Sequence, residues 1–202
     1  MLNKTAFIRL ATLFEAGLLF LALGLGWLLS IDPLARLRGD VGDLALGLLA
    51  VLPLYIPLQW MLTRPCELAW VNRIKQLMTR MLGECLGQCR RVELLYVAAL
   101  AGIAEEIFFR GLVQTGLEQT FGTFWAVLFS SLLFGLVHWV TPGYALMAGA
   151  AGVYLGLNLY VGGEPNLLIP MVIHTLYDYL ALLGVAKLCR DTGGVLSPGE
   201  DG

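Results

Sequence analysis

The sequence predicts an all-α, polytopic membrane helix bundle of about six transmembrane helices, with one further amphipathic helix at the membrane interface. Of the 202 residues, 58% are hydrophobic and 14% are charged, whereas soluble domains average about 45–50% and about 25%. The mean hydropathy is +0.76, and several apolar runs exceed the ~18 residues that indicate a membrane span. At about 20 residues per helix there is room for about six spans and no separate soluble domain.

The N-terminal part predicts two spans. Residues 10–30 form the first apolar run, which is too long for a cleavable signal and ends at Asp32-Pro33. Residues 44–62 form the second span, in which Pro53 and Pro57 predict a kink that neighbouring helices tolerate in a membrane.

Residues 63–93 form the one long polar segment, and they predict an amphipathic helix lying in the interface. The segment holds six Lys and Arg residues, while apolar side chains recur on one helical face: Trp70, Ile74, Leu77, Met78, Met81 and Leu82. A connector held by anionic lipid is the simpler interpretation, and contact with a substrate is the alternative.

The C-terminal half predicts four more spans, at residues 94–117, 121–140, 144–161 and 167–187. The third of these is rich in Gly and Ala, which suits close helix packing. We therefore expect one transmembrane domain over residues 1–202. Residues 10–93 carry two spans and the amphipathic segment, residues 94–187 carry a four-helix portion that would be catalytic, and residues 190–202 form a flexible tail.

The distribution of basic residues predicts the orientation. Ten of the thirteen Lys and Arg residues fall at the termini or in the 63–93 segment, so the positive-inside rule places both termini in the cytoplasm, in what we expect to be a prokaryotic plasma membrane. The net charge of −2 gives no sign of a nucleic-acid partner, and the oligomeric state stays open. Four cysteines lack a metal or redox spacing and are expected to be free thiols: Cys66, Cys85, Cys89 and Cys189.

Charged residues lie within the predicted spans. Glu105, Glu106 and Arg110 fall in the third span, at a cost of roughly 2.5–3.5 kcal/mol each unless they face a protein interior or water. The only two histidines, His138 and His174, also fall within spans. Such residues commonly mark a functional site in a membrane.

Spacing assigns partners to these groups. Glu106 and Arg110 are four residues apart and can pair on one helix face. Glu105 is rotated by about 100° from Glu106 and needs a partner on another helix, for which His138 or His174 is the candidate. A Glu–His pair can hold and deprotonate a water, while a second histidine donates a hydrogen bond to a developing oxyanion. That set suffices to hydrolyse a peptide bond.

Three motifs occur in order on three apolar blocks. Residues 105–110 have the form EExxxR, residues 134–138 the form FxxxH, and residues 174–178 the form HxxxN/D with Asp178 at its end. Over about residues 92–187 the chain resembles the CPBP (Abi) family, which contains Rce1-type CAAX prenyl endoproteases and bacteriocin-processing relatives. Residues 1–90 resemble nothing that we can name.

The resemblance implies an intramembrane glutamic protease, without a cofactor, that acts on a membrane-associated protein or peptide. Glu105 and His138 would activate the water, and His174 with Asp178 would stabilise the oxyanion. Glu106 and Arg110 would orient the site or the substrate. Prenyl proteases usually carry Asn at the last position, and an ionised Asp cannot donate to an oxyanion. Asp178 is therefore expected to orient His174 and keep it charged.

Other interpretations remain open. Glu105, His138 and His174 could bind zinc, although no HExxH motif is present. A scaffold or bacteriocin-immunity protein could keep the polar network without catalysis. A proton-coupled transporter fits buried charges but lacks inverted repeats. The expected span ends conflict with a pairing of Glu105 and His138. They place His138 about 10 Å nearer the cytoplasmic side of the membrane than Glu105, at ~1.5 Å per residue.

Overall fold

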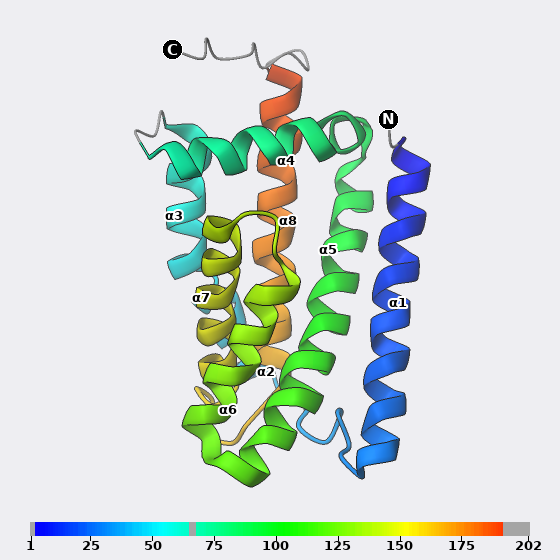
Figure 1. Ribbon diagram of the computed structural model, residues 1–202, viewed down its shortest axis with the longest axis vertical. Coiled ribbons are helices and arrows are strands. Elements are labelled where there is room, and N and C mark those ends of the chain that lie inside the picture. Colours follow the sequence, from blue (N-terminus) through cyan, green and yellow to red (C-terminus); the bar gives the residue numbers. More distant parts are fainter. Residues whose placement is uncertain (1–2, 65–67, 192–202) are drawn as a thin grey trace.

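The chain folds into a bundle of helices with one helix laid across its end (Figure 1). The computed structural model describes residues 3–64 and 68–191, apart from the side chain of Glu84. Within those residues there are helices and no strand. They are α1 (Lys4–Leu29), α2 (Val41–Ala50), α3 (Leu52–Thr63), α4 (Ala69–Gln88), α5 (Arg91–Glu106), the π-helix η1 (Ile107–Gln114), α6 (Thr115–Val137), α7 (Pro142–Asn158) and α8 (Leu168–Asp191).

Four helical stretches in the described part of the chain are long and apolar enough to cross a membrane: Lys4–Leu29, Val41–Thr63, Arg91–Val137 and Leu168–Asp191. The all-α membrane class is thus confirmed. The predicted span at residues 94–117 falls within the third stretch, and the span at residues 121–140 extends three residues beyond its end at Val137. The predicted fifth span corresponds to α7, which has only 17 residues, so the number six stays a prediction.

Local chemistry sets the ends of the N-terminal helices. Asn3 caps α1 through a bond from the Ala6 amide (2.8 Å), and Asp40 caps α2 through the Asp43 amide (3.0 Å), as short polar side chains do at helix N-termini. The kink expected in the second span lies at Val51, where α2 gives way to α3 just before Pro53. Proline lacks the amide hydrogen that would continue the α2 hydrogen bonds.

Helix α4 crosses the end of the bundle at which α1 begins and α8 ends (Figure 1). This placement matches the predicted amphipathic helix. Ile74 packs inward together with Val71 and Leu86, whereas Trp70 and Met81 are exposed on the outer surface of the protein.

The turn between the third and fourth predicted spans explains the apparent difference in depth between Glu105 and His138. The chain reverses at Gly122, whose φ of 77° suits glycine, and α6 then returns alongside η1 (Figure 1). Glu105 lies 17 residues before this glycine and His138 lies 16 residues after it. The expected difference of about 10 Å was wrong because the span boundaries were misplaced.

Glycines allow the helices around the site to approach closely. A Cβ on Gly135 of α6 would lie 2.7 Å from the Ala145 carbonyl oxygen of α7, which agrees with the predicted small-residue packing. A Cβ on Gly102 of α5 would lie 2.3 Å from Thr175 Oγ1 and 2.7 Å from the Thr175 backbone nitrogen of α8. The α5–α8 contact next to His174 therefore depends on Gly102.

The expected thiols and tail are only partly within the described residues. Cys85, Cys89 and Cys189 are buried thiols, as predicted, and Cys66 lies outside the described residues. Helix α8 continues to Asp191, so the first two residues of the expected tail are helical. Residues 192–202 lie outside the described part.

We predict that Gly102→Ala lowers stability by about 1–3 kcal/mol, because the new methyl group collides with the backbone of Thr175. Gly17→Ala is the matched control, since a Cβ there meets nothing within 4 Å. Alanine in that exposed helical position should leave stability unchanged or raise it by up to about 1 kcal/mol. Thermal unfolding in detergent measures both variants, and equal midpoints for the two would contradict the close α5–α8 contact.

Candidate active site

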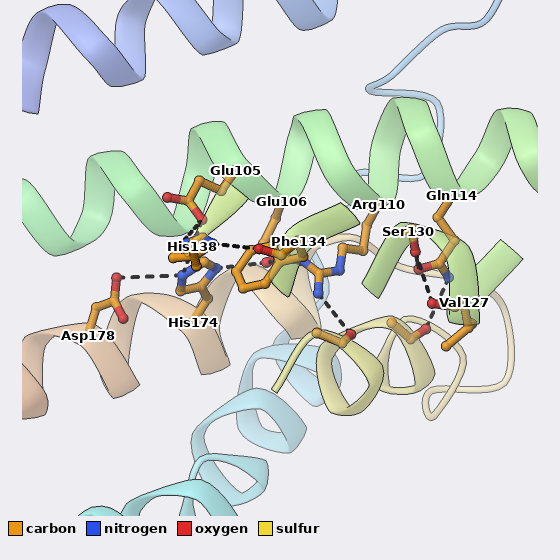
Figure 2. Close-up of polar contacts among 12 residues, drawn as sticks. Glu105, Glu106, Arg110, Gln114, Val127, Ser130, Phe134, His138, His174 and Asp178 are labelled. Carbon is orange, nitrogen blue, oxygen red and sulfur yellow. Dashed lines mark hydrogen bonds and ion pairs between the residues drawn. The ribbon is translucent and has the colours of Figure 1, made fainter. Parts of the chain in front are cut away.

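The six predicted site residues come together from four helices (Figure 2). Glu105 and Glu106 end α5, Arg110 lies in η1, His138 follows the last residue of α6, and His174 with Asp178 lie on α8. Residues up to 73 positions apart in the sequence thus share one buried centre.

Glu106 joins this centre together. Its Oε1 accepts a bond from Arg110 Nη1 and another from His174 Nδ1, each at 2.7 Å. Glu106 and Arg110 are almost completely buried, and His174 is 5% exposed. The predicted Glu106–Arg110 pair is confirmed. A carboxylate buried in this way is stable only because the cationic groups compensate its charge.

Arg110 connects Glu106 to helix α7. Its Nη2 donates to the Gly152 carbonyl oxygen at 2.8 Å, and its guanidinium lies 4.8 Å from the centre of the Phe134 ring. Thr115 Oγ1 donates to the Arg110 carbonyl at 3.0 Å, which satisfies an acceptor that the wider π-helical turn presents. Single π-helical turns are common at functional sites because they redirect side chains.

His138 is held by the motif that contains it. Its Nδ1 donates to the Phe134 carbonyl oxygen at 2.8 Å, and its ring stacks on Phe134 with 4.4 Å between ring centres. This contact confirms the predicted packing of Phe134 beneath the ring. Because a carbonyl only accepts, the hydrogen is on Nδ1, and Nε2 is left to face the centre of the site.

Glu105 lies opposite both histidines. Its Oε2 is 3.7 Å from His138 Nε2 and 3.8 Å from His174 Nε2, so both partners that the spacing left open are present. These distances are too long for direct hydrogen bonds. Oε2 is buried and has no hydrogen-bond partner among the described residues. The three atoms therefore lie close together, and no direct hydrogen bond joins Glu105 to either imidazole ring.

Asp178 is less tightly engaged than expected. Its Oδ2 lies 3.5 Å from His174 Nε2, whereas the 2.7 Å bond to His174 comes from Glu106 on the other ring nitrogen. Glu106 therefore orients the ring. Asp178 faces the nitrogen that also faces Glu105.

A cavity of about 110 Å³ opens onto the site from the side of α7. His138, His174 and Asp178 line it, together with Tyr144 and Tyr177. The two tyrosines were not singled out from the sequence, because each lies in an apolar helical run where an aromatic residue is ordinarily a packing residue. The cavity thus borders both imidazole rings.

The sequence reasoning also missed Glu15 of α1. This carboxyl group is 7% exposed and its Oε2 has no hydrogen-bond partner among the described residues. A usable signal was present, since Glu15 is the one charged residue within the apolar run 10–30.

Fold and site together define a polytopic membrane protein with a buried centre of two glutamates, two histidines and an arginine. Residues 89–180 match the family described as type II CAAX prenyl endopeptidase, Rce1-like. This segment contains all six site residues. The match supports the Rce1-type family for residues 89–180, and that family implies protease activity. No curated protein and no solved structure shows significant similarity to the chain.

We predict that Glu106→Gln lowers stability by about 3–5 kcal/mol, because it leaves the buried Arg110 guanidinium uncompensated. Adding Arg110→Met removes that charge as well and should recover a large part of the loss. Unfolding midpoints of the single and double variants form a cycle that measures the coupling. Strictly additive losses would show that the two side chains do not depend on each other.

Proposed function

We propose that the chain is an intramembrane endopeptidase in which Glu105, with the two histidines, activates water to hydrolyse a peptide bond. The observation that carries this proposal is the arrangement of Glu105 Oε2 at 3.7 and 3.8 Å from two imidazole Nε2 atoms. A water between them is within reach of a general base and of two groups that can orient it.

The proposed reaction follows from these positions. Glu105 takes a proton from water while His138 Nε2 accepts the water's other hydrogen bond, and the hydroxide adds to the scissile carbonyl carbon. Charged His174 then donates from Nε2 to the oxyanion that forms. Collapse of this intermediate breaks the C–N bond, and the proton held by Glu105 passes to the leaving amine.

The remaining residues support this arrangement. Glu106 fixes the His174 ring through Nδ1, and Arg110 fixes Glu106, as partners beyond the reacting groups do in enzyme sites. Glu105 Oε2 argues against a purely structural network. A buried carboxylate oxygen without a partner costs free energy, which a protein that needs only packing has no reason to retain.

The substrate that we propose is a membrane-associated protein or peptide carrying an apolar group next to the scissile bond. An apolar cavity of about 230 Å³ lies between α3, α4 and α8 and shares Tyr144, Tyr177 and Asp178 with the smaller cavity at the site. An apolar group bound there would hold the adjoining peptide beside the histidines. A prenylated CAAX-type peptide, the substrate class named by the family, is the first to test.

We also propose that both termini face the cytoplasm. The first residues of α1 and the last of α8 lie at the end crossed by α4 (Figure 1), and this end carries most of the basic residues. Substrate cleavage would then occur on the cytoplasmic side of the membrane.

We predict that Glu105→Gln lowers the cleavage rate at least about a hundredfold, the contribution expected of a general base. Folding should be unaffected, because the amide replaces a carboxylate oxygen that has no partner. Mass spectrometry of peptide products, with protein in liposomes, measures the rate. Glu118→Gln is the control, since that carboxylate pairs with Arg36 outside the site.

Cleavage by Glu105→Gln at the wild-type rate would show that another group activates the water. Failure of the wild-type protein to cleave both prenylated and unprenylated membrane peptides would contradict the proposed activity and favour a scaffold.

A further inference from the structure

The apolar cavity of about 230 Å³ between α3, α4 and α8 has polar groups at two separate places. Tyr144, Tyr177 and Asp178 line it where it meets the smaller cavity beside the histidines. Lys75 and Thr79 line it at helix α4. Apolar side chains make up the rest of the wall, among them Leu58, Met78, Val97, Ala101 and Leu182.

Helix α8 gives the distance between these two polar places. The α8 residues that line the cavity begin at Tyr177 and end at Leu188, which is 11 residues later and therefore ~16 Å away at ~1.5 Å per residue. The later end of this stretch lies against α4, because Cys189 Sγ donates to the Thr79 carbonyl oxygen at 3.7 Å. The cavity thus extends along α8 from the site to the helix that crosses the end of the bundle (Figure 1).

Lys75 lies at the α4 end of this cavity, one turn before Thr79, whose hydroxyl donates to the Lys75 carbonyl oxygen at 2.7 Å. The Lys75 side chain is half-buried. Its Nζ donates to the Arg64 carbonyl oxygen at 3.3 Å, which is long for a hydrogen bond, and no carboxylate in the described part of the chain pairs with it. An ammonium has three N–H donors, so Lys75 can bind an anion at this end of the cavity.

Lys75 is the one cation among the described residues that line the cavity. The other basic residues of α4, Arg73 and Arg80, are exposed and do not line it. Attraction of α4 to an anionic membrane surface requires only exposed cations. The position of Lys75 at the edge of an apolar cavity therefore indicates a ligand that is itself apolar with an anionic end.

The direction of a peptide decides which part of a substrate fits this description. With the scissile bond beside the histidines, one side of the substrate extends along the cavity towards Lys75. The N-terminal side ends in a cation when it ends at all, whereas the C-terminal side ends in a carboxylate. An extended chain covers ~3.3–3.6 Å per residue, so ~16 Å accommodates about four or five residues.

We propose that Lys75 binds the free C-terminal carboxylate of the substrate, and that the apolar cavity holds the few residues between this carboxylate and the scissile bond. The proposal rests on the proposed function and identifies the apolar group of the substrate as the side chains that follow the scissile bond. Lys75 is then a specificity-determining residue that touches the substrate far from the reacting atoms.

Binding tests this role without cleavage, in the full chain carrying Glu105→Gln. The probe is a fluorescent, prenylated CAAX-type peptide with a free C-terminal carboxylate, and its C-terminal amide is the matched ligand. Discs of zwitterionic lipid avoid a competing anionic headgroup. We expect the acid to bind about tenfold more tightly than the amide, which is the gain from one hydrogen bond between charged groups. With about ten residues after the scissile bond the carboxylate passes beyond Lys75, and the preference should disappear.

Variants assign the preference to one side chain. Lys75→Met keeps the unbranched apolar stem without the charge, so the acid and the amide should bind equally, both at the affinity of the amide for the unsubstituted lysine. Lys75→Arg retains the charge and should retain the preference. Arg80→Met is the control, since it removes an exposed cation of α4 outside the cavity. Lys75→Gln takes the place of Lys75→Met if unfolding midpoints show that the Met variant folds poorly.

Kinetics of the wild-type protein separate binding from chemistry. Replacing the acid by the amide should raise KM about tenfold and leave kcat within about twofold, because the contact is equally strong in the ground state and the transition state. Lys75→Met should change the KM for the acid in the same way.

Equal affinities of the acid and the amide for the protein with Lys75 overturn the proposal. A preference that survives in Lys75→Met overturns it too, and so does a preference that is lost in Arg80→Met as well, since that result reports only the general charge of α4. A wild-type protein that cleaves no peptide, with the Lys75-dependent preference intact, overturns the proposed function and leaves Lys75 as a carboxylate-binding residue.

Discussion

The bond network of Glu106 is the constraint on which the other features depend. One carboxylate oxygen accepts from Arg110 and from His174 at 2.7 Å each, and Arg110 continues to the Gly152 carbonyl. Helices α5, α7 and α8 and the π-helix η1 are thereby joined at a buried point. In such surroundings a charge is tolerated only with its partners in place, so the helices cannot separate without exposing an uncompensated ion.

The hydrogen bonds around Glu106 and His138 also determine which imidazole nitrogens face Glu105. Because Glu106 uses His174 Nδ1 and the Phe134 carbonyl uses His138 Nδ1, both rings present Nε2 toward Glu105. The structural bonds thus select the nitrogens that face the reacting centre. Glu105 keeps an oxygen without a partner, and the stability lost there is of the kind that active sites commonly sacrifice for function.

Much of the site could be predicted because helical spacing determines which side chains share a face. The four-residue separation of Glu106 and Arg110 predicted their pair, and the rotation of Glu105 predicted partners on other helices. The orientation of His174 could not be obtained in this way. The sequence indicated Asp178 as the residue that orients His174, whereas the bond at Nδ1 goes to Glu106 of α5, a contact that depends on the close packing of α5 against α8 at Gly102.

Span boundaries were the weaker part of the fold prediction. An apolar run does not show where a chain reverses, and the reversal at Gly122 depends on one backbone conformation with positive φ. The level of His138 relative to Glu105 followed from that turn. Glu15 was missed for a different reason: attention went to the cluster of charges at residues 105–110, although a single charge in the apolar run 10–30 is itself a signal in a membrane helix.

Metal analysis of the purified, catalytically active protein tests the central claim most directly, namely that carboxylate and imidazole groups activate the water. The described residues contain no group of three or more His, Cys, Asp and Glu side chains arranged to hold a metal ion. We predict less than stoichiometric metal and full cleavage of a membrane peptide after treatment with a strong chelator. One zinc per chain, lost in Glu105→Ala and required for cleavage, would contradict the claim and establish a metalloprotease.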